Sequence, residues 1–113
     1  MHELGVIIEV AKAVEEIALE NGIQDIDTIV LQIGEISSMI PRYIEECYPA
    51  AVDGTFLEKT KLKLEIIKAT GQCNLCHEPF DIVPSEGFCP SCHTKEWTLL
   101  TGKEFILKEI IVT

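Results

Sequence analysis

Basic residues are scarce in this chain of 113 residues. It has nine Lys and Arg against nineteen Asp and Glu, which gives a net charge of −10 at pH 7. Nucleic-acid binding depends on clustered basic side chains that neutralise phosphates, and the nine in this sequence are scattered. The composition therefore argues against a nucleic-acid partner. It favours an acidic, solvated surface, which could also attract cations or a basic protein.

The sequence also lacks long apolar runs and a signal peptide. No run approaches the roughly 18 apolar residues that a membrane span needs. The first residues include no basic region, and Glu9, Glu15 and Glu16 interrupt the apolar residues there. We therefore expect a cytoplasmic protein with no membrane association, in a compartment where thiols stay reduced. In that compartment five cysteines predict four metal ligands and one spare residue, Cys47.

Signatures of an enzyme are missing as well. The sequence contains no nucleophile–base pair, no phosphate-binding loop and no motif that places a general-acid carboxylate in a cleft. Most carboxylates fall on the polar faces of predicted helices, where solvated charge explains them. We therefore predict that the protein is not an enzyme and has no catalytic residues.

Hydrophobic periodicity predicts an α+β fold. Alternating apolar residues predict strands in IDTIVLQIG, KLKLEIIK and EFILKEIIV, the last at about residues 104–112. A helix is predicted at about 40–52, with Pro41 in its first turn and with Pro49 expected to kink or shorten it. Apolar residues three to four apart predict a further helix at about 4–20. Its predicted inner face carries Val6, Val10, Val14, Ile17 and Ala18.

Together these elements predict a small three-stranded sheet with two helices. The strand–helix–strand unit favours parallel strands joined by a right-handed crossover. Residues 70–102 break the pattern, because they hold four of the five cysteines and three of the five prolines and have no helical period. We expect metal, in place of a large core, to hold this segment in shape. The predicted domains are therefore an α+β domain of residues 1–69 and 103–113 and a zinc-binding domain of residues 70–102.

The cysteines of this segment form two Cys-x-x-Cys pairs, Cys73 with Cys76 and Cys89 with Cys92, separated by twelve residues. Two such knuckles can face each other across a tetrahedral ion, which suits structural Zn²⁺. An iron site with four cysteines, a dithiol redox pair and c-type haem attachment are the alternatives. The haem alternative arises because CNLCH and CPSCH both match C-x-x-C-H. It would require export and a large apolar sheath, and the dithiol alternative would require a thioredoxin-like unit.

His77 and His93 each follow one of the cysteine pairs directly. The simplest interpretation is that they face solvent. Alternatively, they lie beside the zinc ion or replace a cysteine as its ligand, which would make the site sensitive to mild acid.

The first three residues, Met1, His2 and Glu3, form a second set of potential ligands. The α-amine, the amide nitrogen of His2 and its imidazole can close two chelate rings on one ion, and the Glu3 amide or carboxylate can add a fourth ligand. Four nitrogens in a plane suit Ni²⁺ or Cu²⁺ and suit Zn²⁺ poorly. Alone this is a weak signal. The signal is strengthened by its context. The zinc segment has a structural role, so the short chain shows no other functional site.

These features together resemble the HypA/HybF family of hydrogenase maturation proteins, which are nickel metallochaperones. The resemblance covers essentially the whole chain. It rests on MHE and the helix behind it, on the V-x-x-x-G-E-x-S stretch within VLQIGEISSMIP at residues 30–41, and on the paired CxxC motifs ahead of a final strand.

The resemblance implies that Ni(II) is bound at the amino terminus by His2, with Met1 and Glu3 beside it, and is then passed on. It implies structural Zn(II) on Cys73, Cys76, Cys89 and Cys92. The implied partners are a HypB-type GTPase and the precursor of the NiFe-hydrogenase large subunit, with urease accessory proteins in some organisms.

A competing hypothesis is a zinc-ribbon interaction module without transferable metal, in which the amino terminus would be inert. Under either hypothesis, exposed strand edges would allow two copies of the chain to pair as a homodimer.

Overall fold

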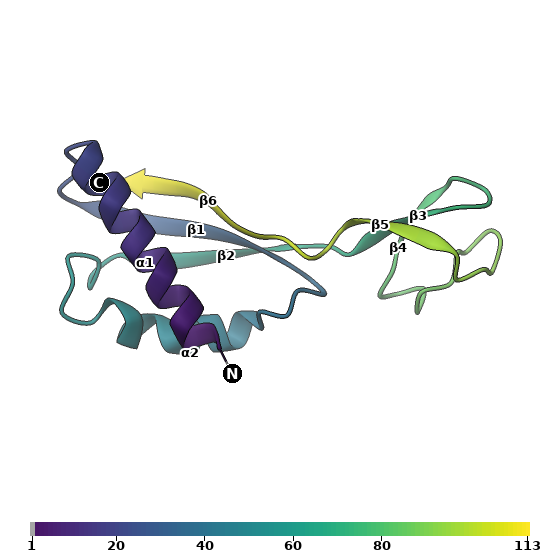
Figure 1. Cartoon of the computed structure of the whole chain (residues 1–113), viewed down its shortest axis with the longest axis horizontal. Helices are drawn as coiled ribbons and strands as arrows, with labels where there is room; N and C mark the ends of the chain where they lie inside the picture. Colours follow the sequence, from purple (N-terminus) through teal and green to yellow (C-terminus); the bar gives the residue numbers. More distant parts are fainter. Residues whose placement is uncertain (1) are drawn as a thin grey trace. The chain divides into compact units, whose positions relative to one another are not determined.

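The structure is a computed structural model that describes residues 2–113 (Figure 1). It confirms the α+β class, with two helices and small sheets. The elements in chain order are α1 (Glu3–Glu20), β1 (Ile26–Gly34), α2 (Pro41–Val52), β2 (Lys61–Ile67), β3 (Thr70–Cys73), β4 (Pro79–Asp81), β5 (Trp97–Thr101) and β6 (Phe105–Val112). Neither helix of the described residues is both long enough and apolar enough to cross a membrane.

The first sheet has the strand order β2-β1-β6. The hydroxyl of Thr60 donates to the carbonyl of Ile26 over 2.7 Å, so β1 and β2 begin side by side and run parallel. The amide of Thr113 lies 3.4 Å from the carbonyl of Asp25, so β6 ends where β1 begins and runs antiparallel to it. The parallel pair flanking α2 is the arrangement that the sequence predicted.

The chain divides into two compact units. The first comprises the residues up to Gln32, Met39–Glu65 and Phe105–Thr113, and the second comprises Ile33–Ser38 and Ile66–Glu104. The second unit contains another antiparallel sheet, in the order β4-β3-β5. These three strands were not predicted from the sequence. The metal-binding roles predicted for residues 1–69 with 103–113 and for residues 70–102 stay predictions.

The buried face of α1 differs from the predicted one. The expected inner residues Val14 and Ala18 are buried, but Ile17 is exposed, and the remaining buried apolar positions are Ile7 and Ala11. α1 packs against α2, a neighbour that periodicity alone does not identify. The predicted core residues Val6 and Val10 instead line an open pocket beside Phe105.

Pro49 does not shorten α2, contrary to expectation. The helix begins at Pro41, where the ring suits the first helical position, and continues past Pro49 to Val52. Three buried side chains anchor it, those of Ile44, Tyr48 and Val52. Spaced four residues apart, they place one stripe of α2 against the core.

Candidate metal centre

The four cysteines of residues 70–102 converge on one point. The sulfur atoms of Cys73, Cys76, Cys89 and Cys92 all lie within 4.8 Å of one another. The sulfurs of Cys76 and Cys89 are 3.6 Å apart. A tetrahedral ion with metal–sulfur bonds of about 2.3 Å separates its ligands by about 3.8 Å. The spacing therefore fits a four-coordinate site with all-sulfur ligands.

Each cysteine pair forms the same backbone turn. The amide of His77 donates to the carbonyl of Cys73 over 2.9 Å, and the amide of His93 donates to the carbonyl of Cys89 over 2.7 Å. One residue later, the carbonyls of Glu78 and Thr94 accept from the amides of Cys73 and Cys89, at 3.0 and 2.9 Å. The repeated pattern aims the two sulfurs of each turn in one direction.

His77 and His93 occupy the left-handed position that closes these turns, with φ of 62° and 61°. Among the described residues, the group of side chains that could share an ion contains the four cysteines and neither histidine. Their position in the turns gives the two histidines a structural role through the backbone. The left-handed region is uncommon for side-chain-bearing residues, although His is enriched there.

The backbone of the first turn favours a thiolate. The amides of Cys76 and Leu75 point at the Cys73 sulfur, at 3.5 and 3.4 Å. These hydrogen bonds, that of Cys76 foremost, lower the pKa of Cys73 to about 7. The pKa of Cys92 is raised instead, to about 12, chiefly by its side-chain hydrogen bond with Cys76. Closely spaced thiols cannot all ionise unless a cation neutralises them, so metal binding here would release protons.

A small apolar core lies under the cysteines. It comprises Ala69, Phe80 and Ile82 with the buried Cys73 and Cys89, and Trp97 and Leu99 pack against it. Trp97 is the register partner of Cys73 across β3 and β5. Its indole N–H donates to the carbonyl of Gly87 over 2.9 Å, and its ring meets Phe80 edge-on at 6.2 Å. The second unit thus combines a hydrophobic cluster with the sulfur cluster.

Of the predicted nickel ligands, His2 and Glu3 lie at the start of α1. Met1 lies outside the described residues. His2 is exposed at the start of α1, and its carbonyl accepts from Val6 over 3.2 Å. The side chain of Glu3 is only 2% exposed, and its carboxylate accepts from the amide of Ile40, 3.3 Å away. Glu3 thereby joins the start of α1 to the start of α2.

Comparison with known proteins bears directly on these two groups of residues. Residues 1–112 match the family model described as "Hydrogenase/urease nickel incorporation, metallochaperone, hypA". The chain belongs to the HypA family. This family consists of metallochaperones and maturation factors, not enzymes, as the sequence predicted. The family's description names nickel incorporation for hydrogenase and urease, which implies partners in maturation.

Relatives of similar length support the assignment to HypA. The hydrogenase maturation factor HypA of Geobacter sp. strain M21 is 33% identical over 110 residues, with 97% of each chain covered. The factor of the same name from Chlorobium limicola is 30% identical over 112 residues, which is 99% of this chain and 97% of that one. The solution structure of the Ni metallochaperone HypA from Helicobacter pylori superposes with a TM-score of 0.67 at 25% identity, covering 99% of this chain and 97% of that one.

The buried Glu3 of this HypA chain predicts a specific response to acid. Hydrogen bonds from its own amide and from that of Ile40 lower its pKa below 4.5. The folded state therefore favours the charged form, so the stabilisation is complete above the unfolded pKa and is lost as the pH falls through the folded pKa. Replacing Glu3 with Gln removes this titration. We expect the difference in unfolding free energy between wild type and Glu3→Gln to shrink from about pH 6 to about pH 3.

Urea unfolding at both pH values measures this difference. Glu9→Gln is the matched control, because Glu9 is exposed on α1 and its carboxylate lies 3.7 Å from the ammonium group of the equally exposed Lys12. A difference for Glu3→Gln that stays constant with pH would contradict the lowered pKa of Glu3.

Proposed function

We propose that this HypA-family chain is a nickel metallochaperone that binds Ni(II) at its amino terminus and delivers it during maturation of NiFe-hydrogenase. The observation that carries the proposal is the family match from residue 1 to residue 112. His2, the second residue, is exposed at the start of α1. A ligand set at a chain end suits delivery, because a recipient can replace its ligands one at a time.

The proposed nickel site uses nitrogen ligands. The imidazole and amide of His2 with the α-amine of Met1 form two fused chelate rings, and the amide of Glu3 completes a plane of the kind that Ni²⁺ accepts. The Glu3 carboxylate takes a different role in this proposal. It is buried and accepts a hydrogen bond from the amide of Ile40 at the start of α2. Glu3 therefore sets the position of the terminus.

We further propose that the four cysteines hold Zn(II) as a permanent structural ion. Four sulfurs within 4.8 Å complete the tetrahedral shell that structural zinc prefers, and no position is left open for a substrate. Two of the sulfurs belong to the buried residues Cys73 and Cys89. Such burial favours retention of the ion over transfer.

The proposed partners follow from the nickel route. They are a HypB-type GTPase, the precursor of the hydrogenase large subunit and, where urease is made, urease accessory proteins. Support comes from the family description, which names both hydrogenase and urease. We propose that nickel delivery takes place in the cytoplasm, where the thiols of the zinc site stay reduced. A homodimer is a further assembly to be tested.

Nickel titration of untagged, zinc-loaded protein tests the proposal. We expect one Ni(II) per chain and a visible absorption band of a planar low-spin ion. Changing His2 to Ala is expected to lower nickel affinity by about 100-fold or more, because even residues that only orient a ligand contribute 10- to 100-fold. A peptide tag fused to Met1 should have the same effect, since it converts the α-amine to an amide.

His77→Asn is the matched control, because it removes another histidine and Asn tolerates a left-handed backbone. It should bind nickel as the wild type does, and all these variants should retain zinc. Native protein that takes up one zinc ion and ignores nickel would overturn the proposal in favour of a zinc-ribbon interaction module.

A further inference from the structure

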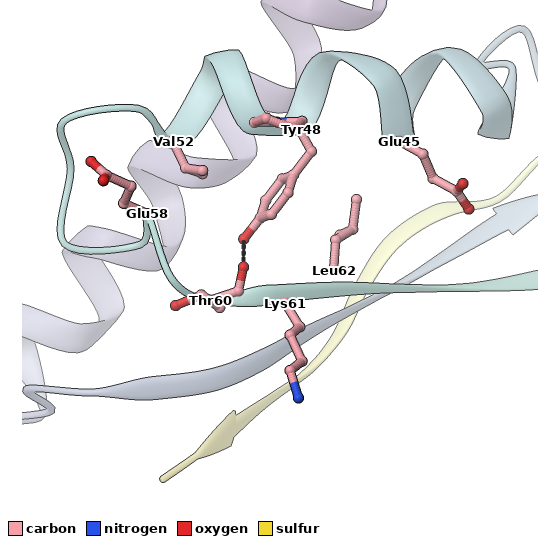
Figure 2. Close-up of a pocket in the computed structure, with 8 residues that line it drawn as sticks. Glu45, Tyr48, Val52, Glu58, Thr60, Lys61 and Leu62 are labelled. Atoms are coloured by element: carbon pink, nitrogen blue, oxygen red, sulfur yellow. Dashed lines mark hydrogen bonds between the residues drawn. The ribbon is translucent and has the colours of Figure 1, made fainter.

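A pocket of about 560 Å³ opens between α2 and β2 in the first unit, distant in sequence from both predicted metal sites (Figure 2). Its lining comes from α2, from β2 and from the loop that joins them. The lining residues are Glu45, Tyr48, Pro49, Val52, Glu58, Thr60, Lys61 and Leu62. Neither the fold nor the proposed nickel delivery requires a hollow here.

The floor of this pocket is apolar and firmly held. Tyr48, Pro49 and Val52 recur on one face of α2, and Leu62 rises from β2 toward them (Figure 2). The hydroxyl of Tyr48 donates to the carbonyl of Thr60 over 2.9 Å. Burial raises the pKa of Tyr48 to about 12, so the hydroxyl keeps its proton. The aromatic ring is thereby fixed as part of the wall between helix and strand.

Negative charge borders the apolar floor. Glu45 extends at one end of the pocket and Glu58 at the other (Figure 2). The carboxylate of Glu58 is held in place, because it accepts from the amide of Gly54 over 2.8 Å. The ammonium group of Lys61 points away from the helix, so it does not neutralise either carboxylate from within the pocket (Figure 2).

Pro49 adds an acceptor that ordinary helices do not offer. Within α2 the carbonyl of Glu45 would accept a hydrogen bond from the amide of residue 49. Proline has no amide hydrogen, so this carbonyl is left without that donor. Glu45 and Pro49 both line the pocket. One helical hydrogen bond is therefore missing beside the pocket, and in the proposal below the Glu45 carbonyl serves as a second acceptor.

We propose that this pocket is a docking site for an arginine side chain in an extended segment of a protein partner. A guanidinium group has five N–H donors in one plane and a weakly hydrated face. It can satisfy the Glu45 carboxylate and carbonyl together while its face and aliphatic stem cover Tyr48 and Pro49. Glu58 attracts further positive charge on the same segment. This inference goes beyond nickel delivery and does not depend on it.

The probe is a blocked peptide, acetyl-Gly-Ser-Arg-Ser-Gly-amide, titrated into zinc-loaded, full-length, ¹⁵N-labelled protein. Amide shifts should concentrate at Glu45, Val52, Glu58 and Leu62. The same peptide with citrulline, which keeps the shape and loses the charge, should bind at least about tenfold more weakly, because hydrogen bonds to charged groups contribute most. Free arginine amide should bind more weakly than the peptide. Equal binding of either comparison ligand would overturn the proposal.

Three variants separate the parts of the site. Glu45→Gln should weaken binding of the arginine peptide by about two- to fivefold, as expected for a partly exposed ion pair. Pro49→Ala restores the missing helix donor. It should weaken binding of the arginine peptide by about two- to tenfold, although the helix itself becomes more regular. Glu46→Gln changes the neighbouring charge outside the lining and should leave binding unchanged. Equal weakening by Glu45→Gln and Glu46→Gln would show general charge attraction and would overturn the specific site.

Discussion

Replacing Cys73 with Ser is expected to abolish zinc binding and unfold the second unit. Structural zinc contributes about 10 kcal/mol or more to the folding of small domains. The small cluster around Phe80 and Ile82 cannot replace that contribution in a unit of this size. Metal analysis should fall from one zinc per chain to nearly none. The fluorescence of Trp97, the single tryptophan, should shift to longer wavelength, because its register partner is Cys73 itself.

The spare cysteine supplies the matched control for this experiment. Cys47 lies in α2 and belongs to the first unit. Cys47→Ser should therefore retain zinc and the fluorescence of the wild type. If Cys73→Ser kept a full zinc ion and an unchanged emission maximum, the all-sulfur site would have to be abandoned.

Replacing Gly34 with Ala is expected to destabilise the second unit by about 3 kcal/mol or more, at the upper end of the cost of overpacking. A Cβ atom at residue 34 would overlap the carbonyl oxygen of Gly102 and would lie 2.5 Å from the amide nitrogen of Lys103. These are backbone atoms, which cannot rotate away as a side chain would. Gly102 is equally constrained, since it has φ +128° and would place a Cβ 2.7 Å from Ala69 Cα.

Thermal unfolding with zinc bound measures the effect of Gly34→Ala. Gly5→Ala is the matched control, because a Cβ there meets nothing within 4 Å and alanine stabilises helices relative to glycine by up to about 1 kcal/mol. The two substitutions add the same methyl group, and we expect shifts of opposite sign. Equal melting temperatures for wild type and Gly34→Ala would show that the contact relaxes without cost.

The elements of the first unit were predictable because each has its own periodicity. β2 alternates charged and apolar residues, α1 shows apolar residues three to four apart, and Pro41 indicates the start of α2. The buried stripe of α1 was misplaced because periodicity alone cannot tell which neighbours a helix will have. The short strands β3, β4 and β5 escaped prediction for a related reason. At three to five residues each, they are too short for alternation to stand out.

The sulfur cluster was predictable from spacing, because two Cys-x-x-Cys turns have few ways to face each other. The placement of Glu3 was not, because nothing in MHE reveals that a carboxylate will be buried against the start of a helix almost forty residues later. The pocket beside Tyr48 was also missed. Its only local signal is Pro49, which was interpreted as a helix breaker. The helix instead continues past Pro49, and one carbonyl lacks its usual helical donor.

The GEIS segment at residues 34–37 has a consequence for protein engineering. It contacts two separate stretches of the same chain, one at Ala69 and the other at Gly102. The Glu35 carboxylate accepts from Ala69 at 2.9 Å, and the amide of Ile36 donates to the carbonyl of Gly102 over 2.9 Å. A cassette cut only at residues 66 and 104 would leave both partners behind. Grafting this unit into another scaffold would therefore require transplanting two separate stretches of chain together.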